Sequence, residues 1–100
     1  MTVVVVLEDA AADIESGRQF YNSFEAEVGT YFVDSIFADL ERLVNLAGIH
    51  PFHFGLRRML CKRFPYAIYY EVEDETTFVY AILDLRRDPV WIRNQLAKRD

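Results

Sequence analysis

The sequence predicts an α+β domain in which a helical hairpin packs on a small, mostly antiparallel sheet and a short helix ends the chain. A β-branched segment opens the chain, and two stretches with helical spacing of apolar residues follow it. Three segments with strand character then fill most of the C-terminal half, so the expected order is β-α-α-β-β-β-α. The length of 100 residues suffices for one hydrophobic core, and we expect a single domain over residues 1–100.

The first strand and the first helix are predicted from short-range patterns. Residues 2–7 (TVVVVL) are β-branched and lack polar alternation, which is typical of a strand covered on both faces. Residues 8–27 predict a helix, because three consecutive alanines favour it and the apolar side chains after them keep roughly helical spacing. Gly17 interrupts this pattern and, inside a helix, costs about 1 kcal/mol relative to alanine.

The second helix has the clearest periodicity of the chain. Between residues 32 and 47, apolar side chains recur at steps of three or four residues, which places them on one helical face. Thr30 is the expected N-cap and Gly48 the expected C-terminal stop. Because the two helices meet near Gly29, they predict a helical hairpin.

The C-terminal half predicts three strands and a last helix. Residues 49–56 contain a proline and a glycine and predict a loop. The strand candidates are residues 57–64, which are basic, residues 67–73, which alternate, and residues 76–85, which are apolar on both faces. An acidic turn joins the last two strands, and the third is expected to lie centrally in the sheet. Asp88-Pro89 marks a break, after which a helix is expected to about residue 98.

Charge is distributed unevenly along the chain. The net charge is −5, but residues 1–50 carry two basic and nine acidic side chains, whereas residues 51–100 carry nine basic and seven acidic ones. Residues 51–70 hold four basic side chains and no acidic one: Arg57, Arg58, Lys62 and Arg63. The overall acidity argues against a general nucleic-acid binder, yet a local basic face is compatible with this distribution.

The sequence contains no recognisable targeting or membrane segment. The run Val3–Leu7 is too short for a signal-peptide core, and no stretch approaches the roughly 20 apolar residues of a membrane helix. The single cysteine, Cys61, cannot form an internal disulfide, and we expect a buried, unreactive thiol. These features predict a cytoplasmic protein with no membrane association.

Motifs that would define an enzyme by themselves are absent. There is no P-loop, dinucleotide-type glycine pattern or zincin helix. His50 and His53 lack further ligands nearby, so we expect no metal and no cofactor. The arginine pairs are more informative, because a guanidinium offers a planar fork to phosphate and keeps its charge at any working pH. From these residues alone, an enzyme and a binding module remain equally open.

Two segments of the C-terminal half carry a family resemblance. The first is RFPY at residues 63–66 leading into IYY at residues 68–70, and the second is ILDLRRDP at residues 82–89, followed by Trp91. Together with the order of elements, they resemble the RelE/ParE superfamily of bacterial type II toxins. The resemblance implies a cytoplasmic bacterial toxin with a cognate antitoxin protein as its partner, either as a toxin–antitoxin hetero-oligomer or with a homodimeric toxin.

The resemblance favours the ParE-like branch of the superfamily, which poisons DNA gyrase. The RelE-like branch cuts messenger RNA on the ribosome, and only one of three side chains typical of it is matched, by Arg87 with Arg86 beside it. Ala67 stands where that branch places an arginine, and Arg93 where it places a tyrosine. The target-binding residues implied for the ParE-like branch are Arg58, Arg63, Arg86, Arg87 and Arg93.

Two alternatives stay open. A RelE-like endoribonuclease would use Arg87, with Arg86, as a catalytic phosphate-stabilising residue in a site rearranged around His50, His53 or Tyr69. A non-toxic interaction domain on the same scaffold is the second alternative, because a fold does not fix a function. In either case Asp84 is expected to neutralise part of the charge of the neighbouring arginines.

The helical hairpin is expected to present an apolar groove to the antitoxin. It carries more aromatic surface than one face of a small sheet covers: Tyr21, Phe24, Phe32 and Phe37. Amphipathic partner segments commonly fill such grooves.

Overall fold

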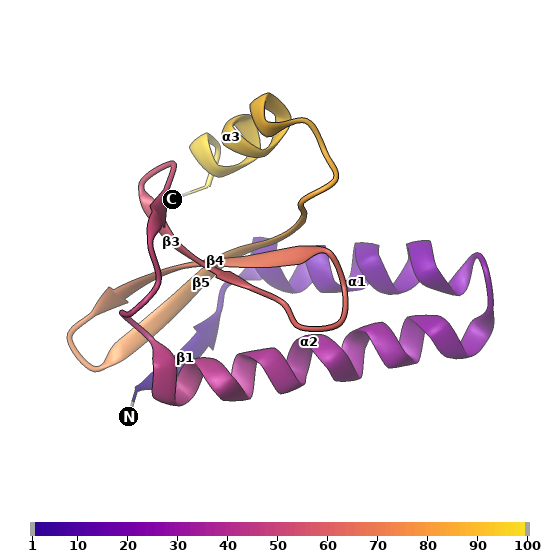
Figure 1. Cartoon of the computed structure of the whole chain (residues 1–100), viewed down its shortest axis with the longest axis horizontal. Coiled ribbons are helices and arrows are strands. Elements are labelled where there is room, and N and C mark those ends of the chain that lie inside the picture. Colours follow the sequence, from indigo (N-terminus) through magenta and orange to yellow (C-terminus); the bar gives the residue numbers. More distant parts are fainter. Residues whose placement is uncertain (1, 100) are drawn as a thin grey trace.

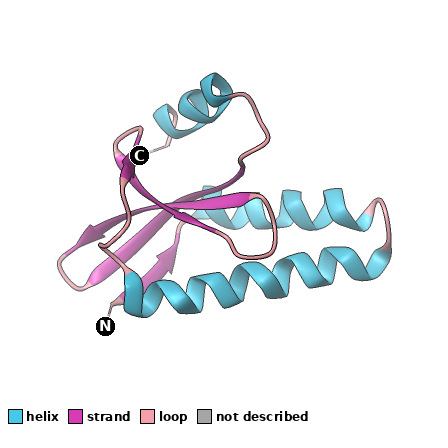
Figure 2. Cartoon of the chain, viewed as in Figure 1, coloured by secondary structure: helices cyan, strands magenta, loops and turns pink. Residues whose placement is uncertain are grey.

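The computed structural model describes residues 2–99 and places one five-stranded sheet between a helical hairpin and a short C-terminal helix (Figures 1 and 2). The elements are β1 (Val3–Val6), α1 (Glu8–Asn22), α2 (Ala26–Leu46), β2 (Phe52–His53), β3 (Leu56–Leu60), β4 (Tyr66–Glu73), β5 (Thr76–Asp84) and α3 (Pro89–Ala97). The strand order is β1-β5-β4-β3-β2, with β1 parallel to β5 and the other pairs antiparallel. The predicted α+β class is confirmed.

The hairpin turn lies earlier in the chain than predicted. Helix α1 ends at Asn22, not at residue 27, because the Ser23 hydroxyl donates to the Phe20 carbonyl, in competition with continued helical bonding. The N-cap of α2 is Glu25, in extended conformation, and the predicted Thr30 cap is wrong. Gly29 is buried inside α2, where its N–H donates to the Asn22 side chain at 3.1 Å.

Gly17 allows the two helices of the hairpin to approach each other. A methyl group at this position would overlap the ring of Phe32, which has no exposed surface. Gly17 is therefore required for packing. Its close contact with the buried ring of Phe32 offsets the helix propensity that a glycine loses relative to alanine.

The segment before the basic strand is a short hairpin, not a loop alone. Residues 52–53 form β2, and the turn to β3 places Phe54 and Gly55 at φ values of 55° and 87°. Two consecutive positive φ values are typical of the two-residue turns that match strand twist. Strand β3 is shorter than the predicted segment 57–64, since it ends at Leu60 and leaves Phe64 in the following loop.

A β-bulge lets β5 bury apolar side chains on both faces of the sheet. Tyr70 pairs with Val79 and Tyr69 with Ala81, so Tyr80 is an extra residue in β5. Val79 consequently packs under the hairpin, and Ala81 packs under α3. The prediction that this strand is interior to the sheet is confirmed, because β5 lies between β1 and β4.

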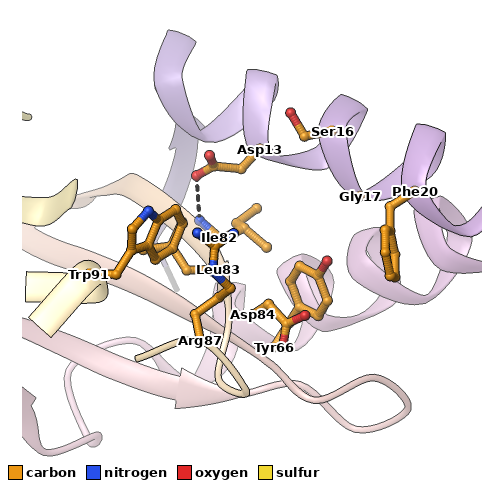
Figure 3. A pocket seen from close by; sticks show the side chains of 10 residues that line it. All are labelled: Asp13, Ser16, Gly17, Phe20, Tyr66, Ile82, Leu83, Asp84, Arg87 and Trp91. Carbon is orange, nitrogen blue, oxygen red and sulfur yellow. Dashed lines mark hydrogen bonds between the residues drawn. The ribbon is translucent and has the colours of Figure 1, made fainter. Parts of the chain in front are cut away.

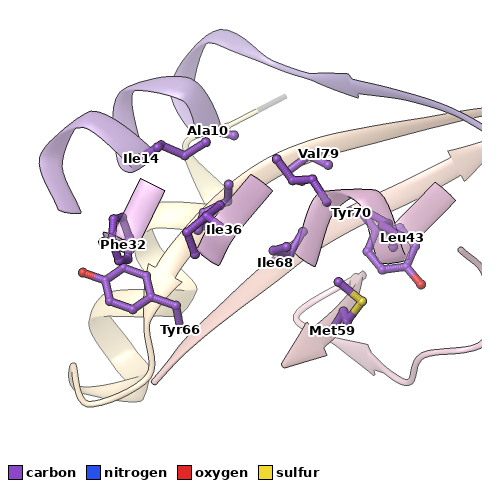
Figure 4. Close-up of a cluster of buried hydrophobic side chains, with 12 residues drawn as sticks. Ala10, Ile14, Phe32, Ile36, Leu43, Met59, Tyr66, Ile68, Tyr70 and Val79 are labelled. Carbon is purple, nitrogen blue, oxygen red and sulfur yellow. The ribbon is translucent and has the colours of Figure 1, made fainter. Parts of the chain in front are cut away.

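The larger core lies between the hairpin and the sheet, and Figure 4 shows its side chains. Its centre contains Phe32 and Ile36 of α2 against Ile68 and Tyr70 of β4. A smaller cluster packs α3 on the opposite face and consists of Ala67, Tyr69, Ala81, Leu83, Ile92 and Leu96. Three strand tyrosines, Tyr66, Tyr69 and Tyr70, are core residues, whereas Phe78 and Tyr80 are half-buried. None of the helices within residues 2–99 combines the length and hydrophobicity that a membrane span requires.

The outer edge of β5 loses its strand partner after Val79. Strand β1 is so short that its pairing ends there, with the Leu7 N–H bonded to the Val79 carbonyl at 3.0 Å. The Asp13 carboxylate of α1 then accepts from the Ile82 N–H at 2.9 Å. Arg99 binds the same carboxylate at 2.5 Å and donates to the Tyr80 carbonyl at 3.1 Å. Side chains from both ends of the chain therefore close this edge.

We predict that Gly17→Ala destabilises the fold. The gain of about 1 kcal/mol in helix propensity is outweighed by overlap with Phe32, and overpacking a core costs about 1–3 kcal/mol. Urea denaturation should show a lower free energy of unfolding. Phe32→Leu shortens the opposing side chain, so the double variant should lose less than the sum of the two single variants. An alanine variant more stable than the wild type would contradict this packing role.

Candidate functional site

A cleft of about 340 Å³ opens between α1, the end of β5 and the start of α3 (Figure 3). Helix α1 supplies one wall, the ends of β4 and β5 the floor, and the segment that leads into α3 the other wall. The lining residues are Asp13, Ser16, Gly17, Phe20, Tyr66, Ile82, Leu83, Asp84, Arg87 and Trp91.

Arg87 is held in this cleft by stacking on Trp91. Its guanidinium carbon lies 3.7 Å from the centre of the indole ring, in a cation–π contact (Figure 3). The geometry follows from the local sequence, because the Asp88 side chain accepts from the Val90 N–H at 2.8 Å and Pro89 occupies the first helical turn. The predicted start of the last helix is confirmed, and Trp91 lies close enough along the chain to contact Arg87.

Both carboxylates of the cleft have cationic partners. Asp84 accepts three hydrogen bonds from the Arg86 guanidinium, at 2.7, 3.0 and 3.2 Å, and Asp13 is paired with Arg99. Burial alone would raise the pKa of Asp84, but the hydrogen bonds from Arg86 outweigh it and hold the pKa below its ordinary value. None of the ion pairs found within residues 2–99 involves Arg87. Arg87 therefore supplies the uncompensated positive charge of the cleft.

Comparisons with known proteins identify the fold. No family model matches the sequence, and no curated protein matches it. Among solved structures, the chain is similar to one described as "Chromosomal ParDE TA system from P. aeruginosa", with a TM-score of 0.71 and 21% sequence identity. The match covers 82% of this chain and 94% of that chain. The fold is that of a ParDE chain. At 21% identity, this likeness is one of fold.

Within this ParDE fold, the five arginines expected to bind a target do not form one patch. Arg87 lines the cleft, and Arg86 lies beside it, bonded to Asp84 and, at 3.2 Å, to the Tyr21 hydroxyl. Asp84 thus neutralises Arg86 through an ion pair. Arg87 makes no ion pair with Asp84 and only contributes, as a nearby charge, to lowering its pKa.

The other three arginines lie outside the cleft. Arg58 is on β3 opposite Tyr69 of β4, and its Nε is buried without a hydrogen-bond partner among the described residues. Arg63 is exposed in the loop between β3 and β4, and Arg93 is exposed on α3. The ParDE fold thus separates residues that the sequence alone could not place relative to one another.

The ParDE fold does not assemble the rearranged nuclease site. His50 is bonded at 2.5 Å to the hydroxyl of Tyr70, which also accepts from the Gly48 N–H at 3.0 Å. The pKa of His50 is lowered by burial and by the nearby Arg42 and Arg57, which disfavours its charged form. Tyr69 is buried under α3, and neither it nor His50 or His53 lines the cleft.

No metal centre is formed by the described residues. Within residues 2–99, no group of three or more His, Cys, Asp or Glu side chains could hold an ion. Cys61 is half-buried just after β3, and burial and Asp39 raise the pKa of its thiol. Ala67, at the expected arginine position of the nuclease branch, is completely buried.

Sequence reasoning missed the side of the cleft that α1 contributes. Phe20 and Ser16 belong to the helix opposite Arg87, and Tyr66 forms part of the floor. The one available signal was Asp13, a charged residue next to Ile14 on the apolar stripe of a helix. Its partners lie in β5 and at the C-terminal end, too far along the chain to be found from periodicity.

The exposed aromatics of the hairpin only partly match the predicted groove. Phe24 and Phe37 are exposed, and the exposed fraction of Phe24 is 71%. Phe32 is completely buried, and the ring of Tyr21 stacks on it with 5.2 Å between the ring centres. The ring of Phe24 contacts that of Phe20, 5.2 Å away, which itself lines the cleft. The aromatic surface therefore continues from the tip of the hairpin into the cleft.

We predict that Asp84→Asn strengthens binding to polyanions. The substitution releases Arg86 from its ion pair and adds one free guanidinium beside Arg87, so the protein should elute from heparin at higher salt, with a salt slope larger by about 1. Asp74→Asn is the matched control, because it makes the same charge change in the exposed β4–β5 turn at a φ of 55° that asparagine also tolerates. Equal shifts for both variants would show that only net charge matters.

Proposed function

We propose that this protein is the toxin component of a bacterial type II toxin–antitoxin system. It is ParE-like, binds and inhibits an essential target such as DNA gyrase, and is neutralised by a cognate antitoxin. The observation that carries the proposal is the likeness of the fold to a ParDE chain across most of both chains. The free charge of Arg87, held at the mouth of a cleft, supports it as the principal contact residue.

The cleft favours binding over RNA cleavage. Cleavage needs a group that moves the proton of a 2′-hydroxyl, and such proton transfer contributes about 10²–10⁴-fold in rate. The titratable hydroxyl that lines the cleft is that of Tyr66, and burial, with Tyr21 and Asp84, raises its pKa far from neutrality. The carboxylates of Asp84 and Asp13 are already paired with Arg86 and Arg99. Arg87 can hold an anion here, but among residues 2–99 no suitable base lines the cleft beside it.

The remaining arginines would make separate contacts, because three of them lie outside the cleft. Arg93 and Arg63 are exposed and available to a large partner surface, whereas Arg58 is half-buried and Arg86 is already bonded to Asp84. We therefore assign the largest share of target binding to Arg87 and smaller shares to the other four. Arginines at the centre of interfaces commonly contribute 2 kcal/mol or more, which is about a 30-fold change in affinity.

Pulse labelling of growing bacteria after induced expression tests the proposal. We expect early loss of thymidine incorporation while methionine incorporation continues, because gyrase inhibition stops DNA synthesis first. Early loss of methionine incorporation would instead support the RelE-like nuclease. If neither changes and growth continues, the non-toxic interaction domain is the correct alternative.

Arg87→Gln should relieve the growth arrest. Arg87 is exposed and makes no ion pair within residues 2–99, so the variant is expected to fold. Lys98→Gln is the matched control, since it removes the same charge from an exposed position at the end of α3, outside the cleft. Relief by both variants to the same degree would argue for net charge, and relief by neither would remove Arg87 from the mechanism.

A further inference from the structure

We propose that the cleft around Arg87 is a recognition pocket for one carboxylate side chain carried on an apolar peptide segment of a protein partner. The inference deepens the proposed function by naming the chemistry that the site takes, and it rests on that function only for the identity of the partner. Binding itself can be measured on the purified protein without any toxic effect.

The charges of the cleft match one carboxylate. Asp13 and Asp84 are each neutralised by an arginine other than Arg87, so the site retains a single positive charge. The Arg87 guanidinium lies with its face on Trp91, which leaves the planar fork of N–H donors at its edge for a bidentate partner. A carboxylate has the shape and the charge for this fork.

The surroundings disfavour a nucleic acid as the ligand. Helix α1, which forms one wall, exposes Glu8, Asp9 and Glu15, and its single arginine, Arg18, is paired with Glu15 at 2.6 Å. A nucleic-acid backbone needs several phosphate contacts in succession, and here it would run along an acidic helix. A single acidic side chain reaches Arg87 without that repulsion. The observations therefore favour a protein ligand over RNA or DNA.

The walls of the cleft favour apolar neighbours for this carboxylate. Trp91, Tyr66 and Phe20 contribute rings to the lining, and Phe20 is 47% exposed. Phe20 continues into Phe24, so the apolar surface extends from the pocket along the hairpin. The volume of about 340 Å³ is at the small end of ligand pockets, which suits one or two side chains. An acidic residue flanked by leucines is the ligand that this combination fits.

Trp91 is the single tryptophan of the chain and reports directly on the pocket. We would titrate the purified protein with acetyl-ALELA-amide and follow Trp91 fluorescence together with its indole N–H signal in two-dimensional NMR. The matched probes are acetyl-ALQLA-amide, which lacks the charge, and acetyl-ASESA-amide, which lacks the apolar neighbours. Inorganic phosphate and a short single-stranded oligonucleotide serve as the alternative anions.

We expect a saturable response to acetyl-ALELA-amide and at least tenfold weaker binding of the glutamine peptide, because a hydrogen-bonded charge pair is lost. Arg87→Gln should cause a similar loss, whereas Lys98→Gln should bind like the wild type. Equal binding of the glutamine peptide, no response up to about 10 mM peptide, or tighter binding of phosphate or oligonucleotide would each overturn the proposal.

The two proposals fail in distinguishable ways. Growth arrest by a protein whose cleft binds no acidic peptide would refute the pocket and leave the toxin function standing. Peptide binding by a protein that does not affect growth would refute the toxin function and leave the pocket standing. Tight binding of acetyl-ASESA-amide would refute the apolar requirement within the pocket proposal.

Discussion

The open edge of β5 is the constraint on which the arrangement of this molecule depends. Its strand partner ends at Val79, and the backbone groups beyond it need hydrogen bonds because buried peptide groups are costly when unpaired. Asp13 supplies an acceptor to Ile82, and Arg99 both balances that carboxylate and donates to Tyr80. One polar cluster thus connects α1, β5 and the end of α3, segments that no shared secondary structure joins.

The cleft is a consequence of this closure. Helix α3 packs on its face of the sheet through a small apolar cluster. The ion pair between Asp13 and Arg99 attaches the C-terminal end of the chain to α1 as well. With α3 held there, Trp91 stands opposite α1 and carries Arg87 on its ring. Asp84 then pairs with Arg86, so that one of two adjacent arginines is neutralised and the other keeps its charge. The charge of the site is therefore set by Asp84, which neutralises Arg86 and leaves Arg87 charged.

Local patterns in the sequence predict much of the fold but little of the cleft. Helical periodicity finds the hairpin and apolar continuity finds the interior strand, because both signals arise from burial along one element. The bulge at Tyr80 depends on pairing with another strand, and the end of α1 depends on a hydrogen bond from the Ser23 side chain to the Phe20 carbonyl; neither leaves a signal in the periodicity of apolar residues. Arg87 is predicted from a family motif, whereas Asp13 acts through an ion pair with a residue 86 positions away, which no local pattern reveals.

A supercoiling assay with purified DNA gyrase is the most direct test of the account, because it separates action on the target from every other cellular effect. The account predicts that the protein inhibits supercoiling at micromolar concentration and that Arg87→Gln, folded as judged by circular dichroism, requires about 30-fold more protein for the same inhibition. Supercoiling that continues unchanged at micromolar wild-type protein would contradict ParE-like action through this cleft.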